Sequence, residues 1–174
     1  MNRSEMKKFI QTLSAYEAAH VLTDLLYNDP ALVEKAYDTA MKLAEAVDAD
    51  AIKNDIFYRL DGLDADDLNS RSGRTRHGYV DPSEAAWEMF EEALDPFVYE
   101  MKKSQERALP AAAKAHCVGI VMGLLKYEKE SVSDFSEWIV DAPGEYIDSV
   151  IEEWKKSGPS EEDIAEVMGI AGGD

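Results

Sequence analysis

The sequence predicts an all-α protein, and three observations support that prediction. Apolar residues recur at the helical spacing of three and four positions along most of the 174 residues. Helix-start signals, in which Asp, Ser or Pro precedes an apolar run, separate these segments. No stretch alternates polar and apolar residues for long enough to require a sheet. We therefore expect stacked antiparallel helical hairpins, in either a solenoid-like arrangement or an irregular helical bundle.

The first sixty residues predict four consecutive helices. Ser14 and Glu17 have the spacing of a capping box, which begins the second helix. Asp29 and Pro30 stop that helix and begin the third, with Asp29 as N-cap and Pro30 at the first helical position. An aspartate, Asp48 or Asp50, caps the fourth. We expect these helices at 4–13, 14–27, 30–47 and 48–60.

The rest of the chain predicts a loop followed by further helices. Residues 61–81 have the pattern of a loop with room for one helical turn at 63–68, and Asp81 then caps a helix that begins at Pro82. Pro96 lacks a backbone donor, which predicts a kink or short break. Gly119 and Gly123 lie one turn apart, where small residues let a neighbouring helix approach closely. We expect the helices at 82–101, 109–127, 133–140, 143–156 and 159–168.

The length predicts one all-helical domain over 1–174, long enough to bury a core without disulfides or metals. Within it, 1–60 and 82–170 form candidate sub-units joined by the 61–81 loop. The helix lengths resemble those of HEAT and TPR arrays, but no repeat period is detectable in the sequence.

The charge of the chain restricts its partners. It carries 36 acidic and 18 basic residues, a net charge of −18 at pH 7. Such a field repels nucleic acid and anionic membranes and favours a protein partner with a basic segment, although solubility alone also explains it. No charged-then-apolar leader and no long apolar run occur, so we expect a cytoplasmic protein with no membrane contact. Its single cysteine, Cys117, lies in an apolar stretch and predicts a small core residue.

One loop reverses the charge. Residues 68–80 contain three arginines, one histidine and no acid, whereas 81–100 contain seven acids and no base. Glycines and a following helix N-terminus favour an anion there, and arginine binds carboxylate or phosphate bidentately. The candidate ligand- or partner-binding residues are Arg71, Arg74, Arg76, His77 and Tyr79. The alternative is that these arginines pair with neighbouring acidic helices and hold the loop in place.

Other chemistry has little support in the sequence. Glu17 and His20 form Glu-x-x-His, but a di-metal helical site needs two such pairs and further glutamates. No Ser/His/Asp or Cys/His arrangement can be placed. We therefore expect no catalytic residue, no metal and no cofactor. The tryptophans lie on apolar helical stripes and are expected to pack in the core; they are Trp87, Trp138 and Trp154.

Residues 56–127 carry a longer pattern. Its segments are Leu60–Leu63, Arg71–Arg74, Gly78–Pro82, Glu84–Trp87, Asp95–Phe97 and Gly119–Leu124. This pattern resembles a helical region found beside SWIM-type zinc fingers in prokaryotic proteins. The finger itself needs several cysteine and histidine ligands and is absent here, so its zinc and nucleic-acid roles do not follow. The resemblance implies an all-helical partner-binding role, with the Arg–Gly–Tyr loop as a recurrent feature.

These observations favour a non-enzymatic helical protein-interaction module. It would bind its partner through a helical groove or through the arginine loop at 70–79. The alternative is an enzyme or regulator that binds an anion or small molecule at Arg71, Arg74, Arg76 and His77. A nucleic-acid accessory factor is a third hypothesis, which the net charge of −18 argues against.

Overall fold

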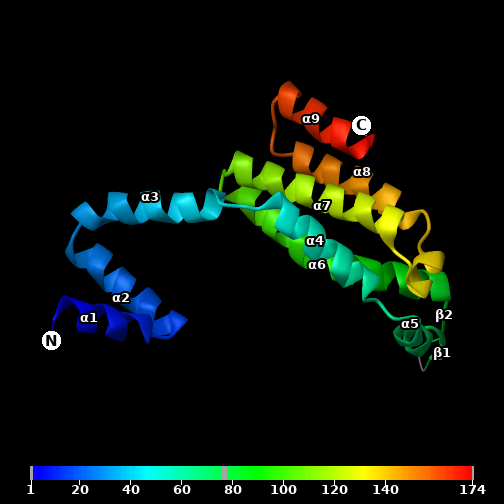
Figure 1. Ribbon diagram of the computed structural model, residues 1–174, viewed down its shortest axis with the longest axis horizontal. Helices are drawn as coiled ribbons and strands as arrows, with labels where there is room; N and C mark the ends of the chain where they lie inside the picture. Colours follow the sequence, from blue (N-terminus) through cyan, green and yellow to red (C-terminus); the bar gives the residue numbers. More distant parts are fainter. Residues whose placement is uncertain (1, 76–77, 174) are drawn as a thin grey trace. The chain divides into compact units, whose positions relative to one another are not determined.

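The computed structural model describes residues 2–75 and 78–173 and divides the chain into two compact units. The first unit is Met1–Leu43 and the second is Ala44–Asp174. Helices dominate both, so the all-α prediction is confirmed (Figure 1). Among the described residues, no helix is both long and apolar enough to cross a membrane.

Three helices make the first unit, which we call the N-terminal unit. They are α1 (Arg3–Gln11), α2 (Ala15–Asn28) and α3 (Ala31–Glu45), whose last turn extends past the unit boundary. The predicted capping box is present, since the Ser14 side chain accepts from Glu17 N–H and the Glu17 side chain accepts from Ser14 N–H. Asp29 Oδ1 accepts a hydrogen bond from Ala31 N–H at 3.1 Å, as expected of a cap.

The N-terminal unit has amphipathic helices but no interior. None of the residues in α1, α2 or α3 is buried. Apolar side chains that would fill the core of an ordinary domain are exposed instead, among them Phe9 at 61% and Leu25 at 50%. Local capping signals and helical periodicity therefore account for its helices, while tertiary burial within this chain contributes little.

The second unit contains all the remaining elements. They are α4 (Ala49–Asp61), α5 (Ala65–Arg71), β1 (Gly73–Thr75), β2 (Gly78–Val80), α6 (Pro82–Glu106), α7 (Pro110–Glu130), the 3-10 helix η1 (Asp134–Trp138), α8 (Ala142–Lys155) and α9 (Glu161–Ala171). Helix α7 lies at the centre, in contact with α4, α6, α8 and α9 (Figure 1). Lys114 fastens α9 to α7, since its Nζ lies 2.6 Å from both an Asp163 and a Glu166 carboxylate oxygen.

Helices α4 and α7 pack closely because α7 presents glycine to its neighbour, as the sequence predicts. A Cβ on Gly119 would lie 2.7 Å from Ile52 Cβ, and one on Gly123 would lie 2.8 Å from Ile56 Cβ. Both contacts advance by one turn in the same direction, so α4 and α7 run parallel. Helices α6 and α8 run antiparallel to α7 (Figure 1). This mixture of directions makes the second unit an irregular bundle, one of the two architectures that the sequence left open.

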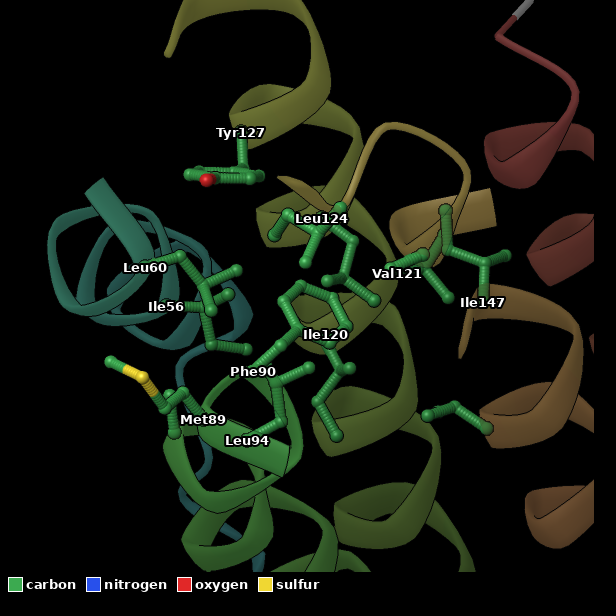
Figure 2. Packing of buried hydrophobic residues seen from close by; sticks show 14 of the residues in the cluster. Ile56, Leu60, Met89, Phe90, Leu94, Ile120, Val121, Leu124, Tyr127 and Ile147 are labelled. Carbon is green, nitrogen blue, oxygen red and sulfur yellow. The ribbon is translucent and has the colours of Figure 1, made fainter. Parts of the chain in front are cut away.

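The core of the second unit lies between α4, α6, α7 and α8. Phe90, Ile120 and Leu124 meet at its centre, fully buried (Figure 2). Cys117 is fully buried as predicted, and burial raises the pKa of its thiol to about 12, so it is a packing residue and not a nucleophile. Trp154 is also a core residue. Trp138 is 45% exposed, so its predicted place in the core is wrong.

Three other local predictions need correction. In the expected loop at 61–81, the single helical turn foreseen at 63–68 is a helix of seven residues, α5, which Asp64 caps, and an antiparallel hairpin of β1 and β2 follows it. Helix α6 continues through Pro96 without interruption; this proline lies on the exposed face, where water can hydrate the carbonyl that loses its helical partner. The helix expected at 133–140 is only the short 3-10 turn η1. The errors at 61–81 and 133–140 concern elements too short for periodicity to define. The error at Pro96 concerns a position whose contact with solvent lets the helix continue.

Candidate functional site

The predicted arginine site lies on the β1–β2 hairpin and the end of α5. Gly73, with φ +86°, and Gly78, with φ +135°, adopt backbone conformations that other residues rarely reach, which explains a glycine at each position. The register places Arg74 directly opposite Tyr79. The two remaining predicted site residues, Arg76 and His77, lie outside the described residues.

One described member of this site, Arg71, is paired with a residue outside the hairpin. Arg71 Nη1 donates to Glu92 Oε2 of α6 at 2.7 Å, and that hydrogen bond raises the pKa of the Arg71 guanidinium. This contact is the structural role that the sequence left as an alternative. Within 2–75 and 78–173, no carboxylate lies within ion-pair distance of Arg74, and Tyr79 is 71% exposed. The anion site therefore stays a prediction that rests on Arg74, Tyr79 and the two undescribed residues.

A second candidate surface lies in the N-terminal unit, between α2 and α3. A groove of about 410 Å³ opens there, and we call it the N-terminal groove. Its lining is almost entirely apolar, with Lys35 as its charged member; the lining residues are Leu22, Leu25, Leu26, Leu32, Lys35, Ala36, Thr39, Ala40 and Leu43. An apolar groove between two helices is the usual receptor for the apolar face of a third helix.

The charge of the N-terminal unit differs from that of the second unit. Residues 1–43 carry five bases and six acids, whereas 44–174 carry 13 bases and 30 acids. The net charge of −18 is thus almost entirely a property of the second unit. A near-neutral apolar surface on an otherwise strongly acidic chain is typical of a contact region, because desolvating it costs little electrostatic free energy.

A third hollow, of about 540 Å³, lies on the second unit where α4, α6 and α7 meet. Asp55, Tyr58, Arg59, Glu100 and His116 contribute its polar groups. Local sequence patterns do not reveal this hollow, because its residues come from three helices that are distant in the chain.

His116 in this hollow makes the stability of the second unit depend on pH. Burial lowers the pKa of its imidazole below the ordinary value, while Glu100 acts in the opposite direction. The unfolded chain therefore binds the proton more readily than the folded chain, so the free energy of unfolding falls as the pH drops below about 6.5. We expect His116→Gln to remove this component. Urea unfolding at pH 7.5 and 5.5, followed by tryptophan fluorescence, measures it.

The matched control for that experiment is His20→Gln, which changes an exposed histidine of the N-terminal unit. It should keep the wild-type pH dependence, because all three tryptophans that report unfolding lie in the second unit. A His116→Gln protein whose urea midpoint still falls as steeply as that of the wild type would contradict the assignment.

The Glu-x-x-His pair of α2 has local partners. His20 Nε2 lies 2.9 Å from the Tyr16 hydroxyl oxygen, and Glu17 bonds to Ser14. Among the described residues, no three His, Cys, Asp or Glu side chains are grouped closely enough to hold a metal ion.

Comparisons with protein-family models, curated proteins and solved structures find no match.

Proposed function

We propose that this chain is a non-enzymatic protein-interaction module whose partner binds in the N-terminal groove. The observation that carries the proposal is that no residue of the amphipathic helices α1–α3 is buried. Helices of 9 to 15 residues are marginal in water unless their apolar faces pack against something. A partner surface would supply that packing.

The distribution of exposed apolar side chains supports the same choice of surface. Of the 18 large hydrophobic residues that are exposed among the described residues, 11 belong to the N-terminal unit, which has a quarter of the chain. Single exposed apolar residues are normal on a protein surface, but a concentration of this kind marks an interaction site. The second unit, by contrast, has a core of its own.

The acidic second unit gives this module a further property. Its 30 acids against 13 bases produce a field that attracts basic surfaces and repels acidic ones. The field would raise the association rate of a partner with a basic segment, while the N-terminal groove would supply the apolar contact. The acidic field and the apolar groove both support the protein-interaction module that the sequence favoured. Of the two binding surfaces considered there, we propose the helical groove and not the arginine hairpin.

Affinity capture of the full-length chain from its own cells tests the proposal. Leu22→Asp/Leu25→Asp, the groove variant, places two charges in the N-terminal groove. Val132→Asp/Val140→Asp, the control variant, makes the same change of charge at two exposed valines of the second unit. We expect the wild type and the control variant to retain the same protein, either a second tagged copy of the chain or a different one, and the groove variant to lose it.

The proposal fails if no protein, including a second copy, depends on the groove for capture. A protein recovered equally by all three baits would show an interaction through another surface, and it would count against the N-terminal groove.

A further inference from the structure

We propose that the occupant of the N-terminal groove is the N-terminal unit of a second copy of this chain. This inference rests on the proposed function and names the partner. Each unit carries both halves of such a contact, because it has an apolar groove between α2 and α3 and an unpartnered apolar face on α1. That face includes Met6, Phe9 and Ile10, all exposed.

The area available is adequate for a dimer. Eleven large apolar side chains of the unit are between 41% and 87% exposed. Together they present on the order of 1,000 Å² of surface, against the roughly 800 Å² per partner that a specific interface buries. Six of the eleven belong to the proposed contact, since they lie on the α1 face or line the N-terminal groove: Met6, Phe9, Ile10, Leu22, Leu25 and Leu43. Two copies related by a twofold axis would each bury these six side chains, so one surface needs to complement only itself.

Charge selects this pairing over the alternatives. Two N-terminal units, each with five bases and six acids, approach each other with little repulsion. Two second units, each with 30 acids and 13 bases, repel each other. The near-neutral unit is thus the part of the surface on which two copies can meet.

The constant availability of a second copy is a further reason to propose it as the partner. Exposed apolar surface on this scale promotes nonspecific association whenever the partner is missing. A second copy is present whenever the chain is present, at the same concentration. The contact would also give α1–α3 the interior that they lack, in the way that obligate dimers complete a core across the interface.

Sedimentation equilibrium of the purified full-length chain over the micromolar range tests the inference. We expect twice the monomer mass for the wild type and for Val132→Asp/Val140→Asp. The Leu22→Asp/Leu25→Asp variant should be a monomer, with its dissociation constant raised roughly 100-fold or more, because central apolar contacts dominate an interface.

A second pair of variants guards against loss of helix α2. Leu22→Ala/Leu25→Ala shortens the same side chains without lowering helix propensity, so any helical signal it loses in far-UV circular dichroism reports loss of the contact and not an unfavourable substitution in α2. It should weaken the dimer, while Val132→Ala/Val140→Ala should not. A dimer that survives both leucine pairs would overturn the inference, as would one that both valine pairs also dissociate.

A wild type that is monomeric throughout the range would overturn it as well. The proposed function would survive that result if capture from cells recovered a different protein that depends on Leu22 and Leu25. The two failures can therefore be told apart.

Discussion

Replacing Gly123 with valine is expected to destabilise the second unit by about 2–3 kcal/mol, since side chains forced into a closely packed helix contact cannot be accommodated without displacement. A Cβ at this position would lie 2.8 Å from Ile56 Cβ and 3.1 Å from the backbone carbonyl oxygen of Lys53. The second of these atoms belongs to the backbone, so relief requires α4 to move away from α7. Urea unfolding followed by tryptophan fluorescence measures the change.

Gly169→Val is the matched control for this prediction. Gly169 lies inside helix α9, and nothing stands within 4 Å of the Cβ that a side chain would add there. Glycine is a poor helix former, so valine at this exposed position should leave the free energy of unfolding within about 1 kcal/mol of the wild type. If Gly123→Val unfolded at the same urea concentration as Gly169→Val, the close approach of α4 to α7 would be refuted.

Phe90→Ala should cost about 3–5 kcal/mol of unfolding free energy, the usual range for removing a buried phenylalanine. The Phe90 side chain is fully buried at the centre of the second unit (Figure 2). Its ring meets Tyr146 edge to face, with centroids 5.5 Å apart and an interplanar angle of 87°. The substitution removes this aromatic contact and leaves a cavity that the surrounding helices can close only in part.

Phe9→Ala makes the same chemical change in the N-terminal unit. Phe9 is 61% exposed, so we expect the urea transition reported by the tryptophans of the second unit to stay where it is. A loss of stability as large as that of Phe90→Ala would mean that α1 contributes to the core of the second unit, which would contradict the description of two separate units.

Much of the fold could be predicted from local sequence. The cap at Ser14, the start of α6 at Asp81 and Pro82, and the close contact at Gly119 each depend on a few neighbouring residues or on side-chain size. The hairpin of β1 and β2 escaped prediction because each strand has three residues, too few to show a period of two. The exposure of Trp138 depends on tertiary position: its apolar stripe predicts burial, but the structure leaves the side chain exposed.

The candidate sites were harder to predict, for a physical reason. Periodicity shows that a helix has an apolar face, but it does not show whether that face is covered. Apolar residues recur at helical spacing in both α2 and α7, yet Leu25 is half exposed and Ile120 is fully buried. Charge patterning located the arginine loop, but it could not show that Arg71 is paired with Glu92. Both distinctions require the tertiary structure.

Residue-resolved amide hydrogen exchange of the full-length chain, measured over a range of dilutions, tests the central claim most directly. That claim is that the second unit is stable by itself and that α1–α3 need a partner surface to stay folded. We predict strong protection in α4, α6 and α7 at every concentration. Protection in α1–α3 should be weak at high dilution and should rise as the partner surface is supplied. Protection in α1–α3 that equals that of α7 at every dilution would contradict the claim, because the N-terminal unit would then need no partner.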